Sequence, residues 1–274
     1  MLRKPLAFLK KDFLTEISYR FSFVLQFMSI FFSVVMFYFV AQLLGESPTL
    51  QQKLGDYGGD AAQSYFAFVL IGIAFSNYLS VGLTSFSSSI RAEQMIGTLE
   101  AMLVTPTRLS NIVVSSSLWS FTFTSIQVAV YLLIGGLFFG VDFGNASPLP
   151  AITALILTVI AFSSLGIISA SFIMIFKRGD PIAWVIATSS TLLGGVYYPI
   201  TILPEWLQTL SYIFPITYAL RAIRMSLLKG AGFSEVGGDL LALVIFSVIM
   251  LPISLVVFRY AVARAKRDGS LAYY

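Results

Sequence analysis

Long apolar runs separated by short polar segments dominate the chain. A helix needs ~20 residues to cross a hydrocarbon core of ~30 Å. Six runs meet this length: Phe21–Leu44, Ser64–Ile90, Leu109–Phe139, Ala151–Phe176, Pro181–Tyr198 and Leu240–Phe258. The first run is too long for a signal-peptide core and lacks a small-residue cleavage site, so we interpret it as a retained span. The pattern predicts an all-α polytopic membrane protein, with residues 1–274 forming a single domain of six transmembrane helices.

The segment before the first span has a different pattern. Leu6, Leu9, Phe13 and Ile17 recur at helical spacing, and charged residues fill most of the other positions. This spacing predicts an amphipathic helix over residues 5–20, lying in the interface of the membrane.

Lys and Arg residues are distributed unevenly between the two sides of the six spans. Thirteen lie on the side of the N-terminus: Arg3, Lys4, Lys10, Lys11, Arg20, Arg91, Arg108, Lys177, Arg178, Arg259, Arg264, Lys266 and Arg267. Four lie on the other side: Lys53, Arg221, Arg224 and Lys229. Because basic loops stay in the cytoplasm, we expect both termini and the loop at 91–108 there.

The outer region at 199–238 is apolar in places but contains three prolines, Pro199, Pro204 and Pro215. Arg221 and Arg224 follow one helical turn apart, and each would cost ~2.5–3.5 kcal/mol at mid-span. A seventh crossing would also move the basic C-terminus outside. We therefore predict short re-entrant helices that do not cross the membrane. Two roles remain open for these arginines: binding lipid phosphates or an anionic substrate, or ordinary interfacial anchoring.

The amino-acid composition excludes several kinds of catalytic and metal site. The chain is 57% hydrophobic and 11% charged, and it contains neither Cys nor His. The usual zinc sites, thiol nucleophiles and imidazole bases are thereby excluded, and a membrane-embedded enzyme would lack paired catalytic groups. The six spans contain no Asp, Glu, Lys or Arg, which ion-coupled transporters normally need. The chain also has no Walker-type phosphate loop, so energy for active transport would have to come from a separate ATPase.

Residues 91–108, RAEQMIGTLEAMLVTPTR, form a charged segment between two apolar spans. Apolar residues make one stripe of a predicted helix at 91–104, while Glu93, Gly97 and Glu100 lie on another face, and Thr105-Pro106 ends it. This helix is either a solvated loop or a docking surface for a cytoplasmic partner. The missing energy source favours docking of a separate ATPase.

The more interesting polar groups inside the predicted spans are Gln26, Asn77 and Gln127. Each needs a partner in the bundle or a wet cavity, so they are candidate pathway residues.

The whole chain resembles the permease subunit of ABC-2 type ABC exporters, as found in bacterial drug, lipid and polysaccharide efflux systems. The matching loop residues are Arg91, Glu93, Gly97, Thr98, Glu100, Thr105 and Pro106. In the outer region they are Gly195, Pro199, Leu203, Pro204, Trp206, Leu207, Pro215, Tyr218, Ala219 and Arg224.

The resemblance implies a dimer of permeases in a bacterial-type inner membrane, either a homodimer or a paralogous heterodimer. Two ATPase subunits would lie beneath it and bind the ATP and Mg²⁺. Residues 91–104 would then be the coupling helix, with Arg91, Glu93, Gly97, Thr98, Glu100 and Pro106 as its contact residues. The outer gate would comprise Pro199, Pro204, Trp206, Pro215, Arg221 and Arg224. This chain itself is expected to bind no cofactor, to catalyse no reaction and to contact lipids rather than nucleic acid.

The expected function is ATP-driven export of an apolar or amphipathic small molecule or lipid by alternating access. Export of a lipid-linked polysaccharide is the alternative within the class. From another class, a passive channel or membrane scaffold would leave the acidic face of the charged segment without a role.

Overall fold

The computed structural model describes residues 13–14, 18–44, 61–96, 109–176 and 181–267, and within these ranges it is helical without strands. The elements are α2 (Arg20–Leu44), α4 (Ala61–Ile96), α6 (Leu109–Phe139), α7 (Pro148–Phe176), α8 (Pro181–Leu193), the short 3-10 helix η2 (Ile200–Ile202), α9 (Glu205–Ser211), α10 (Pro215–Leu228) and α11 (Phe233–Arg267). Among the described residues, five helices are long and apolar enough to cross a membrane: α2, α4, α6, α7 and α11. The all-helical, polytopic architecture is confirmed.

The fifth predicted span is shorter than the apolar run suggested. Its helix, α8, has 13 residues and ends at Leu193 rather than at Tyr198. At 1.5 Å per residue this gives ~20 Å, less than the ~30 Å of a hydrocarbon core. Gly194 and Gly195 follow directly, and Gly195 has a φ of 77°, a left-handed conformation that ends the helix. The count of six spans therefore stays a prediction.

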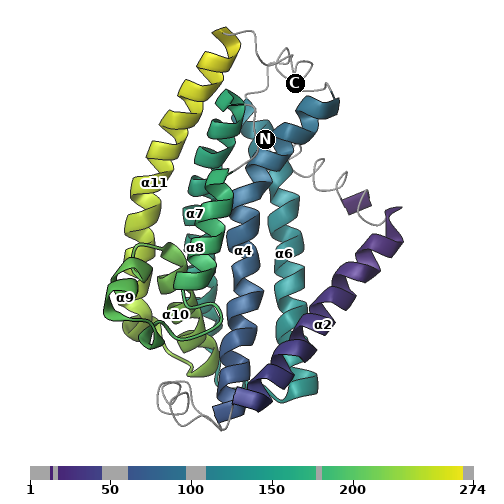
Figure 1. Ribbon diagram of the computed structural model, residues 1–274, viewed down its shortest axis with the longest axis vertical. Coiled ribbons are helices and arrows are strands. Elements are labelled where there is room, and N and C mark those ends of the chain that lie inside the picture. Colours follow the sequence, from purple (N-terminus) through teal and green to yellow (C-terminus); the bar gives the residue numbers. More distant parts are fainter. Residues whose placement is uncertain (1–12, 15–17, 45–60, 97–108, 177–180, 268–274) are drawn as a thin grey trace.

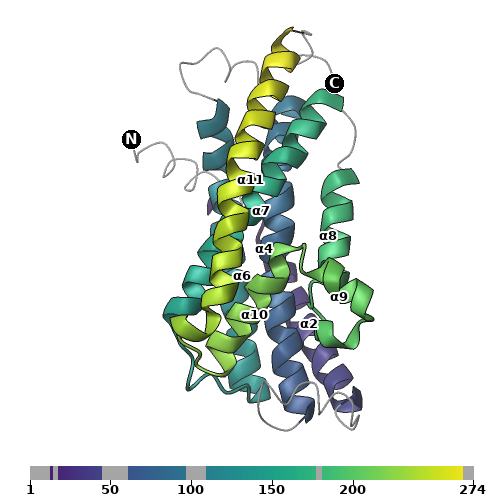
Figure 2. The ribbon, with the colours of Figure 1, turned by 90° about the vertical axis from the view of Figure 1, so that its left-hand side faces the viewer.

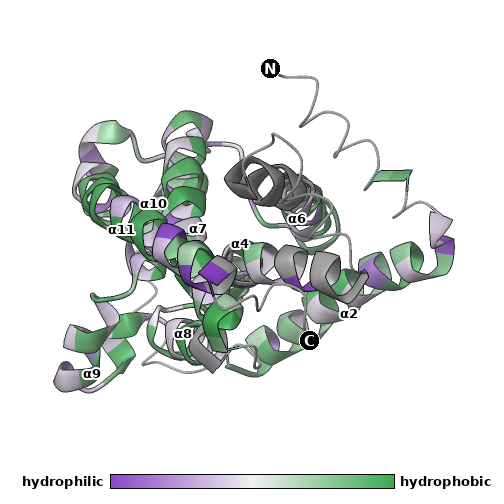
Figure 3. Ribbon diagram, turned by 90° about the horizontal axis from the view of Figure 1, so that it is seen from above, coloured by the Kyte–Doolittle hydropathy of each residue, from purple (hydrophilic) through white to green (hydrophobic). Residues whose placement is uncertain are grey.

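Helix α4 lies at the centre of the bundle, with α6 and α2 on one side and α7, α10 and α11 on the other (Figure 3). Its apolar stretch is 72% buried, whereas α2 and α11 are buried over only 11% and 17%. The central helix is also less apolar, with a mean hydropathy of 1.9 against 2.9 for α11. Burial against protein thus replaces lipid contact for α4.

Helix ends that the sequence predicted on one side of the membrane share one end of the bundle, and the cytoplasmic location of that end stays a prediction. The ends of α4, α7 and α11 and the starts of α6 and α8 lie towards the same end of the bundle (Figure 1). Helix α2 packs against α4 and α6 near Leu44 and leans away from them towards Arg20. Most of the predicted interfacial helix at 5–20 lies outside the described residues. Its Phe13 is helical and contacts Trp119 of α6, with 5.7 Å between ring centroids.

Three short helices fill the predicted outer region, and each begins beside a proline. Pro199 precedes η2, Pro204 precedes α9, and Pro215 occupies the first turn of α10. Helix α10 packs against α7, α11 and α4 (Figure 2). The final long helix begins at Phe233, earlier than the predicted Leu240. Entry of the short helices into the membrane from the outer side stays a prediction.

Candidate functional site

Arg224 is buried where α10 meets α4, with 3% of its surface exposed. Its Nε donates to the carbonyl oxygen of Phe68 at 3.1 Å. Its Nη1 and Nη2 donate to the carbonyl oxygens of Gly195 and Val196 at 2.8 and 3.0 Å. The guanidinium carbon also lies 3.3 Å from the centroid of the Phe68 ring. One side chain therefore joins α10, α4 and the turn after α8.

This position overturns both roles that the sequence left open for Arg224. A buried guanidinium cannot reach a lipid phosphate or a substrate at the outer surface, and it is not an interfacial anchor. The carbonyl oxygens and the aromatic ring take the place of water around the charge. Because these partners come from the backbone, no side-chain pattern in the sequence pointed to them.

Gly72 makes the Arg224 contact possible. A Cβ at this position of α4 would lie 2.1 Å from the carbonyl oxygen of Val196 and 2.5 Å from Nη2 of Arg224. Heavy atoms do not approach so closely, so the turn sits against α4 only because residue 72 has no side chain. We call Gly72, Arg224 and the three carbonyl-bearing residues the Arg224 clamp.

Arg221 has a different environment one turn earlier. Its Nε donates to both carboxylate oxygens of Asp239 in α11 at 2.9 Å, and its Nη2 forms an ion pair with the same group. The side chain of Asp239 is 7% exposed and that of Arg221 is 47% exposed. This pair links α10 to α11. Asp239 escaped notice in the sequence because it precedes the predicted last span.

The remaining residues of the predicted outer gate are spread over this region. Pro199 and Pro215 are buried, whereas Pro204 and Trp206 are exposed. The turn after α8 contacts α2 through Tyr197, whose ring stacks on Phe37 at a centroid distance of 5.7 Å. Tyr197 was not singled out from the sequence, since aromatic residues are frequent throughout these spans.

The three candidate pathway residues come together between α2, α4 and α6. Gln127 Nε2 donates to Gln26 Oε1 at 3.3 Å. One turn further along α6, Tyr131 is hydrogen-bonded to the side chains of Asn77 and Ser33. We call these five residues the polar seam. Ser33 and Tyr131 were missed, although they lie two turns from Gln26 and one turn from Gln127, on the same helix faces.

One face of α4 carries hydroxyl groups. Between residues 64 and 88 the exposed side chains are Ser80, Thr84 and Ser88, with Ser76 half-buried one turn before them. Ser76, Thr84 and Ser88 donate to carbonyl oxygens of their own helix at 2.8, 2.7 and 3.1 Å. These bonds satisfy the donors and leave the hydroxyl oxygens as acceptors. We call the four residues the hydroxyl stripe.

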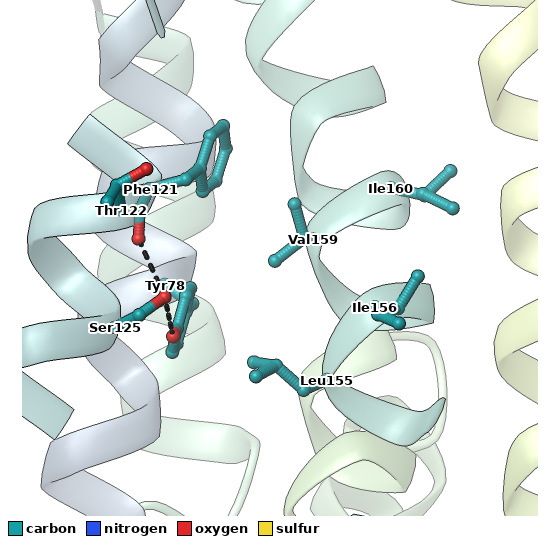
Figure 4. Close-up of a pocket in the computed structure, with 8 residues that line it drawn as sticks. All are labelled: Tyr78, Phe121, Thr122, Ser125, Leu155, Ile156, Val159 and Ile160. Atoms are coloured by element: carbon teal, nitrogen blue, oxygen red, sulfur yellow. Dashed lines mark hydrogen bonds between the residues drawn. The ribbon is translucent and has the colours of Figure 1, made fainter. Parts of the chain in front are cut away.

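A separate groove of about 280 Å³ lies between α6 and α7, with Tyr78 of α4 at its floor (Figure 4). Tyr78 donates to Ser125 Oγ at 2.7 Å, and Ser125 donates to the carbonyl oxygen of Phe121 at 2.9 Å. The lining residues are Tyr78, Phe121, Thr122, Ser125, Leu155, Ile156, Val159 and Ile160. The groove is mainly apolar, and its hydroxyl groups already have partners.

The predicted coupling residues are only partly covered by the structure. Arg91 and Glu93 belong to α4, which continues to Ile96, so no separate helix begins at residue 91. No Gly or Pro interrupts the sequence between Gly82 and Gly97, so the helix continues past residue 91, which explains this correction. Gly97, Thr98, Glu100 and Pro106 lie outside the described residues, and their contact role stays a prediction.

A family profile described as ABC-2 type transporter matches residues 6–228. The chain belongs to the ABC-2 type transporter family. It is 26% identical over 176 residues to the inner membrane transport permease YadH of Escherichia coli, covering 64% of this chain and 67% of that protein. It is also 26% identical over 187 residues to nodulation protein J of Sinorhizobium fredii, covering 68% and 70%. With the probable multidrug ABC transporter permease YbhR of Escherichia coli it shares 25% over 163 residues, covering 59% and 44%.

As an ABC-2 permease, the chain is a multi-pass membrane component of an ABC transporter. The family match ends at Leu228, so it includes the Arg224 clamp, the polar seam and the charged segment at 91–108, but not α11. The Arg221–Asp239 pair crosses this limit, because Asp239 belongs to α11, whereas the hydroxyl stripe and the groove over Tyr78 lie within the matched part of the chain.

Proposed function

We propose that this permease exports an apolar or amphipathic small molecule or lipid, using ATP hydrolysed by a separate subunit. The hydroxyl stripe carries this proposal. A helix that faced lipid would expose apolar side chains, but the exposed side chains of α4 between residues 64 and 88 are all hydroxyls. Such a surface suits a path whose cargo is held by weak hydrogen bonds and apolar contacts. No charged group lies along this stretch to bind an ionic cargo.

The polar seam supports the same location for the path. It stands beside the hydroxyl stripe, between α4 and the helices α2 and α6, and it too is uncharged. A second copy of the permease facing the stripe would enclose the path between two chains. The strongly exposed apolar surfaces of α2 and α11 would remain in contact with lipid.

The ATPase would bind at the end of the bundle where α4 ends. In this proposal, both termini and residues 91–108 are cytoplasmic, and Glu93 and Glu100 make polar contacts with the ATPase. ATP and Mg²⁺ are bound by that partner. Closure of two ATPases on ATP would rock the two permeases and open the outer side, with the short helices around Trp206 and Pro215 as the gate.

The test compares the wild type with Glu93→Arg/Glu100→Arg in a mild-detergent pull-down from native membranes, followed by an ATPase assay of the eluate. The matched control is Asp142→Arg/Glu205→Arg, which reverses two exposed carboxylates outside the segment at 91–108. We expect an ATPase with the wild type and the control, but not with the Glu93/Glu100 variant. A wild type that brings down no ATPase even after crosslinking contradicts the proposal and favours the passive channel or scaffold.

The cargo class is tested with the purified complex in proteoliposomes. A phospholipid labelled with nitrobenzoxadiazole serves as the probe, and its transfer between leaflets is measured with and without ATP. We expect ATP-dependent transfer. Transfer that is equally fast without ATP contradicts active export.

A further inference from the structure

We propose that Arg224 is a positioning residue that makes the turn at Gly194–Tyr198 move together with α4, so that α4 operates the outer end of the path. The inference rests on the proposed function for the direction of coupling. The clamp itself is a property of the chain alone.

Arg224 holds its partners in a fixed geometry. Arg224 bonds to one carbonyl oxygen of α4 and to two consecutive carbonyl oxygens of the turn. A planar guanidinium holds such diverging acceptors in a fixed arrangement, which the flexible point charge of a lysine does not. Gly72 lets the turn lie directly on the backbone of α4, so no intervening side chain can absorb a relative movement.

Helix α4 extends from the clamp to the charged segment. The helix is continuous from Ala61 to Ile96, so it connects the clamp at Gly72 with the start of the charged segment. At 1.5 Å per residue, the distance from Gly72 to Ile96 is ~36 Å, enough to cross the hydrocarbon core. A displacement of the cytoplasmic end of α4 is thereby delivered to the turn as a movement of one rigid element.

The turn also contacts α2. Tyr197 stacks on Phe37 of α2, the least buried of the long helices. A single aromatic pair is weaker than several hydrogen bonds from one buried cation. When α4 and α2 separate, the turn follows α4 and the Tyr197–Phe37 contact breaks. The outer end then opens between the turn and α2.

The chain contains no cysteine, which allows a single introduced thiol to report on the turn. Val196 is fully buried, with 0% of its surface exposed, and Val196→Cys changes its size little. The full chain carrying this thiol is reconstituted with the ATPase obtained from the pull-down. Labelling by a membrane-impermeant maleimide is followed with and without ATP, and ATP hydrolysis is measured in parallel.

Two changes on different helices should release the turn. Arg224→Met removes the bonds to the carbonyl oxygens, and Gly72→Ala introduces a methyl group in contact with the Val196 carbonyl. Without ATP, we expect the labelling rate of the thiol to be at least about tenfold higher in both variants than in the wild type. The labelling rate of Arg224→Lys should lie between those of these variants and the wild type. ATP hydrolysis should continue in these variants without changing the labelling rate.

Matched controls separate this effect from a general loss of structure. Lys229→Met removes an exposed cation just after α10, and Gly136→Ala adds a methyl group to α6, where the nearest atoms are at 3.5 Å. Both should label as slowly as the wild type. If Arg224→Met does not fold, Gly72→Ala and Arg224→Lys provide the test.

The outcomes distinguish the two proposals. Labelling of Arg224→Met and Gly72→Ala at the wild-type rate overturns the role of the clamp. Faster labelling in these variants supports the clamp. If the labelling rate of the wild type is nevertheless the same with and without ATP, operation of the clamp by an ATPase, and hence the proposed function, is contradicted.

Discussion

Gly166 of α7 lies directly on the carbonyl oxygen of Gly82 in α4. A Cβ at Gly166 would stand 1.9 Å from that oxygen, and a Cβ at Gly82 would stand 2.5 Å from the Cβ of Phe162. The two backbones are therefore in contact at this crossing, as small residues allow in membrane helices. The central helix and α7 can pack along their length only because both positions lack a side chain.

Gly166→Ala should therefore destabilise the protein in spite of the higher helix propensity of alanine. We expect a loss of at least ~1–3 kcal/mol, the usual effect of overpacking a tight interior, measured as a lower unfolding temperature in detergent. Gly237→Ala is the control, since no atom lies within 4 Å of a Cβ there. An unfolding temperature for Gly166→Ala equal to that of the control would contradict the close crossing.

Tyr131→Phe should weaken the polar seam without creating a cavity. The change removes the hydrogen bonds to Asn77 and Ser33, each worth ~0.6 kcal/mol and at most ~1.7 kcal/mol inside membrane proteins. A double-mutant cycle with Asn77→Ala measures the coupling, and we expect the two changes to be non-additive by about 0.5–1.5 kcal/mol. Tyr260→Phe, at a position 60% exposed, should be neutral. Additive effects of Tyr131→Phe and Asn77→Ala would show that the two residues do not interact.

The Arg221–Asp239 pair should contribute modestly to stability. Asp239 is nearly buried, but the half-exposed side chain of Arg221 remains screened by its surroundings. We expect a coupling energy of about 1 kcal/mol from a cycle of Arg221→Ala and Asp239→Ala in denaturant unfolding. The single change Asp239→Ala should cost about 1 kcal/mol less than Arg221→Ala. The arginine that Asp239→Ala leaves behind can reach water, whereas the carboxylate that Arg221→Ala leaves behind is nearly buried. No coupling would mean that α10 and α11 are held together by apolar packing alone.

The groove over Tyr78 should accept an added ring. Val159→Phe directs the ring towards about 280 Å³ of space, so we expect stability within about 0.5 kcal/mol of the wild type. Ala154→Phe, five residues earlier in α7 and fully buried, should lose ~1–3 kcal/mol or fail to fold. Thermal unfolding of the two variants side by side gives the answer. Equal destabilisation would mean that the groove closes in solution.

The apolar pattern predicted most of the long helices well. The bounds Leu109–Phe139 agree with α6 at both ends, and α2 and α7 begin within three residues of their predicted starts. The fifth span was placed too long because Val196, Tyr197 and Tyr198 continue the apolar run after the helix has ended. Hydropathy measures transfer into an apolar environment, and it carries no information on the left-handed backbone at Gly195.

In the candidate site, the sequence identified the buried amides but not the role of Arg224. Gln26, Asn77 and Gln127 were found because a buried amide needs a partner, and that requirement can be read from a single residue. Arg224 was expected to meet lipid, substrate or the interface because the sequence offers no partner for it, whereas its partners are backbone carbonyl oxygens brought together by the fold. Such partners are a property of tertiary structure. They can be inferred from sequence only through indirect signs, such as Gly72 and Gly195.

The burial of α4 also has a consequence for the order in which the helices are synthesised and packed. On the ribosome α4 is completed before α7, although α7 forms one of its main contact surfaces. Until α7 has been made, the surface around Gly82 lacks Phe162 and Gly166, against which it packs in the complete chain. A chain that stops before α7 therefore leaves this close-packing surface of α4 without its partner helix. We expect such a truncated chain to be cleared from the membrane faster than the full-length protein.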